Sequence, residues 1–215
     1  MAEIFPKWAN QVPRRLLLGA SGLALLTVLG VGYTFSPEYT DVGYKPRQPI
    51  PFSHKLHVGE LAIDCRYCHS SVEISPVASV PPTETCMNCH SLVGRDSDKL
   101  VPLLESVETG EPIRWIRVHN VPDYAYFDHR AHVGSGVGCV SCHGNVAEME
   151  ETRQVEPLSM SWCLDCHREP DEYLRPLEDV FHPAPPEPSD PVAVAAWMKN
   201  EHHIDPPTDC NGCHH

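Results

Sequence analysis

The stretch Phe127-Asp128-His129-Arg130-Ala131-His132, followed by Cys139-Val140-Ser141-Cys142-His143, decides how this 215-residue chain folds. Its second part is a Cys-x-x-Cys-His motif, the attachment site of c-type haem, in which two thiols bind one porphyrin and the adjacent imidazole binds the iron. Five copies use all ten cysteines, which predicts five covalently bound haems and leaves no thiol for a disulfide. The attachment cysteines are Cys65, Cys68, Cys86, Cys89, Cys139, Cys142, Cys163, Cys166, Cys210 and Cys213, and the iron-binding histidines are His69, His90, His143, His167 and His214.

Zinc binding is an alternative interpretation of the same cysteines. The first two pairs read C-x2-C-x17-C-x2-C and the next two read C-x2-C-x20-C-x2-C, both within zinc-ribbon spacing. A histidine follows the second cysteine in every motif, which a four-cysteine zinc site does not need. The last pair, Cys210 and Cys213, has no partner pair. The pattern therefore favours haem.

Composition limits the class of protein. The chain has 22 prolines and only five phenylalanines, and long apolar runs are confined to the N-terminal part. We therefore expect short helices and loops to wrap the porphyrins instead of building a conventional core. The formal net charge of −13 excludes a nucleic-acid binder, because phosphate recognition needs clustered Lys and Arg. It is compatible with a basic redox partner, with neighbouring subunits, or simply with solubility.

Residues 16–35 form a stretch of 20 residues without a charged side chain. At a rise of about 1.5 Å per residue, a helix of that length crosses a bilayer once. Lys7, Arg14 and Arg15 precede the stretch, so the positive-inside rule predicts a cytoplasmic N-terminus and a haem domain on the outer, periplasmic face. A cleaved signal peptide is the competing interpretation, but the apolar run is long and residues 32–37 make a poor cleavage site. We expect an uncleaved, single-pass anchor.

A duplication of about 75 residues organises the rest of the chain. Residues 52–57 and 127–132 each read F-x-H-x-x-H, and each segment precedes two haem motifs. The fifth motif follows a linker with Pro183, Pro185, Pro186, Pro188 and Pro191, and a short helix is expected over residues 192–200. The predicted organisation is an N-terminal segment with the anchor helix (1–40), a first dihaem unit (41–120), a second dihaem unit (121–180), and the linker with the fifth haem (181–215). The predicted fold class is mainly α, with one transmembrane helix, short helices around haems, much irregular loop and little sheet.

Each haem iron has a second axial position, and a filled position makes the haem an electron carrier. Positions i and i+3 share one face of a helical turn, so the two histidines of F-x-H-x-x-H can serve two adjacent haems. We expect His54 to bind the haem of His69, and His129 the haem of His143. His57 and His132 would then reach other haems. The alternative is one ligand and one solvent-facing histidine in each segment.

The ligand of the remaining haem is left open. Met160, three residues before Cys163, is placed to coordinate a neighbouring haem and raise its potential, or to pack as a flexible filler beside a porphyrin. His119 is an equal candidate. His202, His203 and His215 compete for the C-terminal haem, and the sequence does not choose among them.

The ordered set of motifs resembles the pentahaem cytochrome c subunit of alternative complex III. The resemblance rests on the apolar N-terminal segment, on residues 48–57 (Gln-Pro-Ile-Pro-Phe-Ser-His-Lys-Leu-His), on the five motifs and on residues 158–163 (Leu-Ser-Met-Ser-Trp-Cys). The smaller F-x-H-x-x-H then CxxCH pattern is similar to the wider cytochrome c3 and c7 class.

This resemblance implies a bacterial inner-membrane quinol:acceptor oxidoreductase of several subunits. In that family the subunit works beside an iron–sulfur subunit and polytopic quinol-binding subunits, and it passes electrons to a periplasmic cytochrome c or to an oxidase. The family is similar in having mostly bis-histidine haems with one histidine–methionine haem, which supports Met160 as a ligand.

Three functions compete. An electron-transfer subunit needs no catalytic acid or base of its own. A self-sufficient, membrane-anchored quinol dehydrogenase that feeds a periplasmic reductase shares the anchor and several haems, but the fifth haem, the duplicated unit and the length of the soluble part argue against it. A terminal reductase of nitrite or a similar small molecule needs an open iron, and here the ligand candidates outnumber the irons. The sequence favours the first function.

Overall fold

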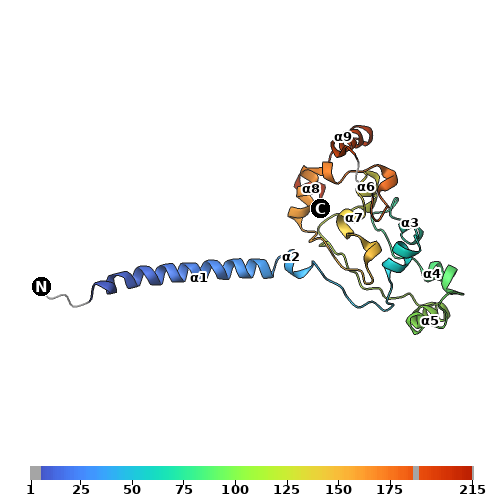
Figure 1. Ribbon diagram of the computed structural model, residues 1–215, viewed down its shortest axis with the longest axis horizontal. Coiled ribbons are helices and arrows are strands. Elements are labelled where there is room, and N and C mark those ends of the chain that lie inside the picture. The colour runs from blue at the N-terminus through green and yellow to red at the C-terminus, as the bar shows by residue number, and fades with distance from the viewer. Residues whose placement is uncertain (1–5, 186–188, 215) are drawn as a thin grey trace. The chain divides into compact units, whose positions relative to one another are not determined.

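The computed structural model describes residues 6–185 and 189–214 and divides the chain into two compact units, Met1–Asp41 and Val42–His215. Pro186, Pro188 and His215, which belong to the predicted linker and ligand candidates, lie outside the described residues. Figure 1 shows one long helix in the first unit, and short helices joined by irregular segments in the second.

The first unit consists of the 3-10 helix η1 (Lys7–Gln11), the long helix α1 (Val12–Thr34) and the single turn α2 (Pro37–Thr40). A proline in the first turn of α1 costs no hydrogen bond there. The span from Lys7 to Thr34 has a mean hydropathy of 1.9, and none of its apolar window is buried. By length and composition this helix can cross a membrane, which confirms the apolar helix predicted over residues 16–35.

The second unit is built from short helical elements. They are the π-helix η2 (Lys55–Glu60), α3 (Cys65–Cys68), α4 (Thr83–His90), η3 (Asp98–Leu100), α5 (Val101–Thr109), α6 (His129–Gly134), α7 (Val140–His143), η4 (Val146–Glu148), α8 (Met160–Arg168), η5 (Pro170–Glu172), η6 (Leu177–Asp179), α9 (Pro191–His202) and η7 (Cys210–Gly212). Within the described part of the chain, β-structure is limited to two isolated antiparallel bridges, Ala125 with His214 and Val137 with Leu174. The mainly helical fold with little sheet is therefore confirmed.

The apolar core of the second unit is sparse. Its one packed cluster among the described residues joins Leu174 to Ala195 and Met198 of α9, with Val137 beside them. Lys199 of the same helix binds the carboxylate of Asp171 at 2.6 Å. The helix predicted over residues 192–200 is thus confirmed as α9, and its buried face holds the helix against η5.

Candidate haem centres

Each Cys-x-x-Cys-His motif contains one short helical turn. The five motifs, numbered first to fifth along the chain, lie in or beside α3, α4, α7, α8 and η7. Residues i, i+3 and i+4 of a turn share a face, so both thiols and the imidazole point to one side. Asp64, Ser159 and Asp209 cap the N-termini of α3, α8 and η7 by accepting hydrogen bonds from backbone amides. Local capping therefore fixes where these three helical elements start.

All ten cysteines lie within the described residues, and all are free thiols. Burial raises the pKa of Cys139 to about 11 and that of Cys142 to about 12, so both remain protonated. Within residues 6–185 and 189–214, no group of three or more histidine, cysteine or acidic side chains gathers as a metal site. The four-cysteine sets that zinc requires are therefore not formed, and the thiols fit attachment of a porphyrin one pair at a time.

Four of the five motif histidines are oriented by backbone carbonyl groups. The acceptors are Ser79 for His69, Val93 for His90, Pro207 for His167 and Tyr124 for His214, at distances of 2.6, 2.9, 2.7 and 2.9 Å from Nδ1. Donation from Nδ1–H leaves Nε2 without a proton, which is the form that binds a metal. This orientation supports the prediction that these four imidazoles are iron ligands.

The two F-x-H-x-x-H segments have the same ring geometry. Phe52 stacks on His57 at 4.5 Å and 21°, and it meets His54 edge-on at 4.9 Å and 85°. The second segment repeats both contacts: Phe127 lies 4.5 Å and 28° from His132, and 4.7 Å and 88° from His129. The phenylalanine of the motif therefore orients both imidazoles.

The second histidine of each segment is anchored locally. Nδ1 of His57 lies 2.8 Å from the carbonyl oxygen of Ser53, and Nδ1 of His132 lies 2.8 Å from that of Asp128. In each case the acceptor is four residues earlier in the chain. Burial lowers the pKa of His132, which keeps its imidazole in the neutral form that binds iron.

Three of the segment histidines face a motif histidine across a gap that suits one iron. An imidazole nitrogen binds a metal at about 2 Å, so two imidazoles on opposite sides of one ion have ring centroids roughly 6 Å apart. The centroid separations are 6.1 Å for His57 with His90, 6.4 Å for His129 with His143, and 6.1 Å for His132 with His167. The last two pairs follow chain order: the first histidine faces the first motif of its unit, and the second histidine faces the second.

His54 is held by a residue far along the chain. Its Nδ1 lies 3.0 Å from Oγ1 of Thr152. Burial, followed by the neighbouring imidazoles of His69, His57 and His119, lowers the pKa of His54 to about 4. His69 has the largest effect of the three, in keeping with the expected pairing of His54 with the first motif.

The histidine of the third motif differs from the other four. Burial and, next in size, the imidazole of His119 together lower the pKa of His143 to about 3. Nδ1 of His143 lies 3.3 Å from Nε2 of His119, with ring centroids 4.3 Å apart and planes at 83°. The sequence predicts both His119 and His143 as axial ligands. In the structure these two side chains are in direct contact.

The fifth motif lies close to two separate segments of the chain, at Tyr126 and at Cys163. The amide of Tyr126 donates to the carbonyl of Cys213 at 2.7 Å, and the thiol of Cys213 is close enough to Cys163 to contribute to its raised pKa, after burial. Met160 begins α8 one turn before Cys163, and the residue is 68% exposed. Met160 is therefore on the turn of α8 that neighbours the fifth motif.

The remaining candidates have other neighbours. The ring of His202 faces Trp197 at 6.1 Å, and His203 ends α9 in a left-handed conformation with φ of 51°. His182, which is not among the ligand candidates, is exposed and accepts a hydrogen bond from the amide of Ala184 at 3.2 Å.

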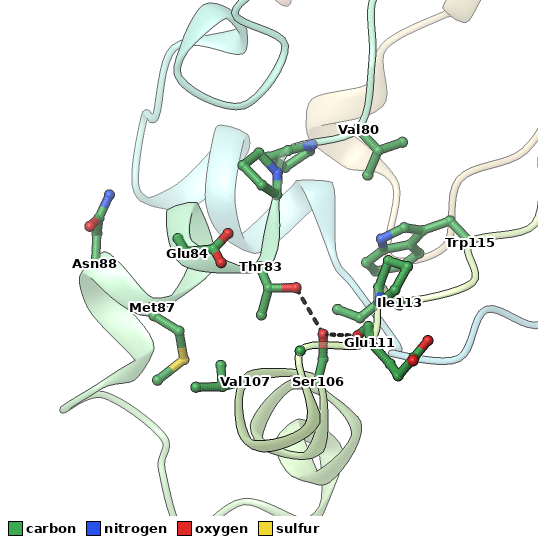
Figure 2. Close-up of a pocket in the computed structure, with 14 residues that line it drawn as sticks. Val80, Thr83, Glu84, Met87, Asn88, Ser106, Val107, Glu111, Ile113 and Trp115 are labelled. Atoms are coloured by element: carbon green, nitrogen blue, oxygen red, sulfur yellow. Dashed lines mark hydrogen bonds between the residues drawn. The ribbon is translucent and has the colours of Figure 1, made fainter.

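A hollow of about 570 Å³ lies beside α4 (Figure 2). Figure 2 shows Met87, Val107 and Trp115 around it, with the hydroxyls of Thr83 and Ser106 hydrogen-bonded at 2.9 Å. The lining residues of α4 are Thr83, Glu84, Met87 and Asn88, whereas Cys86, Cys89 and His90 occupy the other side of the helix. The hollow is therefore separate from the attachment side of the second motif.

Several residues that orient the histidines carry no sequence signal. Thr152 contacts His54 from 98 positions away, and the carbonyl of Pro76 contacts Nδ1 of His129 at 2.8 Å from 53 positions away. A carbonyl acceptor is present in every residue, so no residue type marks these positions. Only the folded chain identifies them.

Comparison with known proteins agrees with the geometry of these centres. Residues 125–215, which contain the third, fourth and fifth motifs, match the family model described as cytochrome c7 and related cytochrome c. The chain is also 35% identical over 138 residues to a protein of Nitratidesulfovibrio vulgaris named menaquinone reductase, multiheme cytochrome c subunit. That match covers 62% of this chain and 64% of the relative, so the chain spans less than two thirds of the relative's length. Over these parts the chain is similar to multihaem c-type cytochromes.

Proposed function

We propose that this chain is a membrane-anchored pentahaem c-type cytochrome that relays electrons as one subunit of a quinol-linked membrane complex. The observation that carries the proposal is the set of three imidazole pairs separated by 6.1 to 6.4 Å. When bound, each haem supplies a one-electron iron couple. Two imidazoles on one iron leave no position for a substrate, so the arrangement supports electron transfer rather than catalysis on a small molecule.

The residues of this chain would hold each haem and tune it. The two cysteines of a motif attach the porphyrin, and the motif histidine takes one axial position. The proposed second ligands are His54 for the haem of His69, His57 for that of His90, His129 for that of His143, and His132 for that of His167. The ring separations support three of these assignments. The fourth is supported by His69, which lowers the pKa of His54 more than any other neighbouring imidazole does.

Met160 is the proposed second ligand of the fifth haem. It is supported by its place one turn before Cys163, whose thiol neighbours that of Cys213. A thioether ligand raises the potential of a haem relative to bis-histidine ligation. The fifth haem would then have the highest potential of the five, which suits an exit toward an acceptor.

The proposed partners are those of alternative complex III: an iron–sulfur subunit and polytopic quinol-binding subunits, with a periplasmic cytochrome c or an oxidase as acceptor. The apolar helix α1 supports a single-pass membrane anchor, and Lys7, Arg14 and Arg15 favour a cytoplasmic N-terminus. The similarity to a subunit of a menaquinone reductase supports a link to quinone chemistry.

The test is purification of the chain from membranes, alone and with its partners. We expect five haem equivalents per chain by pyridine haemochrome assay, iron and no zinc by metal analysis, and quinol oxidation only by the multisubunit preparation. Fewer than five equivalents, or zinc, would contradict the haem assignment. Quinol oxidation by the isolated chain would favour a self-sufficient quinol dehydrogenase, and a high-spin ferric signal that shifts with nitrite would favour a reductase.

A further inference from the structure

The imidazole of His143 has two histidine neighbours with different geometry. His129 lies at 6.4 Å with its ring plane within 7° of parallel, whereas His119 lies at 4.3 Å with its plane at 83°. An ion between two imidazoles requires roughly 6 Å between the centroids. Only His129 meets that requirement, so His119 does not share an iron with His143.

The contact of His119 is instead with the outer nitrogen of the motif histidine. Nδ1 of His143 lies 3.3 Å from Nε2 of His119. In the other four motifs the Nδ1 atom faces a backbone carbonyl oxygen. The third motif is thus distinguished by a side-chain acceptor, and both residues of the contact are half-buried.

We propose that His119 is a positioning residue for the haem of the third motif, and that its Nε2 accepts a hydrogen bond from Nδ1–H of the axial ligand His143. This inference rests on the proposed function. A basic acceptor on the outer nitrogen draws the proton away and makes the ligating nitrogen a stronger electron donor. Stronger donation stabilises ferric over ferrous iron, so His119 lowers the potential of this one haem.

The test uses the full-length, haem-loaded chain. His119→Ala removes the acceptor, and His119→Gln retains an oxygen that can accept. The matched control is His182→Gln, because His182 is exposed and contacts the amide of Ala184. Haem content by pyridine haemochrome assay checks the proposed function separately, since five equivalents are expected in every variant.

In His119→Ala we expect one redox component to shift to higher potential, with all five haems still low-spin. A tenfold change in the reduction equilibrium, of the order that removal of an outer-shell partner causes, is about 59 mV for one electron. We also expect altered g values for one ferric haem by electron paramagnetic resonance, and return toward the parent values in His119→Gln.

Two results would overturn the inference. A high-spin haem that binds carbon monoxide in His119→Ala would make His119 an axial ligand. Potentials and g values identical to those of the parent and of His182→Gln would make it a packing residue.

Discussion

The two predicted dihaem units have the same sequence pattern and the same ring contacts, but within each unit the two histidines are anchored in different ways. In both units the second histidine bonds to a carbonyl of its own segment, at Ser53 or Asp128. The first histidine is held by the other unit: His54 by Thr152 of the second, and His129 by Pro76 of the first. Two of the four predicted ligand histidines are therefore anchored within their own segment, and the other two are anchored by residues of the other predicted unit.

The largest effect is expected from removing haem attachment sites, and it should differ between the second and the third motif. The third motif is packed among others, because Cys139 neighbours Cys65 and Cys142 neighbours Cys166, whereas Cys89 of the second motif is exposed. We expect Cys86→Ala with Cys89→Ala to give a stable protein with four haem equivalents. Cys139→Ala with Cys142→Ala should prevent accumulation of folded protein. Yield and haemochrome content measure both, and equal yields would show that the units contribute equally.

The next prediction concerns the first histidine of each unit. His54→Ala and His129→Ala should each convert one haem to high spin and slow electron flow, without release of covalent haem, because the thioether bonds remain. Absorption and magnetic resonance spectra count the high-spin haems. Five unchanged low-spin spectra in either variant would show that the ligand assignment is wrong for that unit.

Substitutions at two equivalent glycines test how tightly each repeat is packed. Gly59 and Gly134 occupy the same position in the two repeats. A Cβ on Gly59 would collide with the carbonyl oxygen of Ala147, whereas a Cβ on Gly134 meets nothing within 4 Å. We expect Gly59→Ala to destabilise the protein by about 1–3 kcal/mol. Gly134→Ala should be neutral or stabilise it by roughly 0.5–1 kcal/mol. Thermal unfolding followed by circular dichroism measures the difference, and similar midpoints for both variants would contradict the collision.

The proposed ligand of the fifth haem, which lies outside the duplicated segments, is tested by substitutions of Met160. Met160→Ala should lower one midpoint potential and leave the other four in place, because a thioether favours ferrous iron. Met160→Leu should behave in the same way, since it keeps the bulk and removes the sulfur. A redox titration resolves the components, and an unaltered titration would make Met160 a packing residue.

The smallest effect is expected at Thr152. Thr152→Val removes the hydroxyl that contacts Nδ1 of His54, and a hydrogen bond of this kind contributes about 1 kcal/mol. We expect a small potential shift of one haem with its low-spin spectrum retained, and no shift in Thr152→Ser. A shift in both variants would point to packing rather than to the hydroxyl.

The sequence predicted the features that depend on short spacing. The apolar run over residues 16–35 and the pattern over residues 192–200 each became a helix near the predicted position, because hydropathy and local signals decide such elements. The scarcity of apolar runs likewise predicted short helices and little sheet. The assignment of each haem ligand stays a prediction that the ring geometry supports.

The contacts between residues far apart in the chain could not be predicted from the sequence. The carbonyl groups of Pro76 and Pro207 orient His129 and His167, although nothing in their residue type indicates it. His119 was predicted as an axial ligand from its residue type alone, and its position against His143 depends on how residues far apart in sequence meet. Helix α5 gave no chemical signal either, since it carries no motif residue.

The sparse interior of the second unit has a consequence for biogenesis. A polypeptide with so few buried aliphatic side chains, Leu103, Val180 and Met198 among them, gains little free energy by collapsing on its own. Before haem attachment the polypeptide would then be largely unfolded, with its motifs accessible. It would become compact only after the porphyrins are attached. We therefore expect the chain without haem to be unfolded and sensitive to proteases, and the haem-loaded chain to resist them.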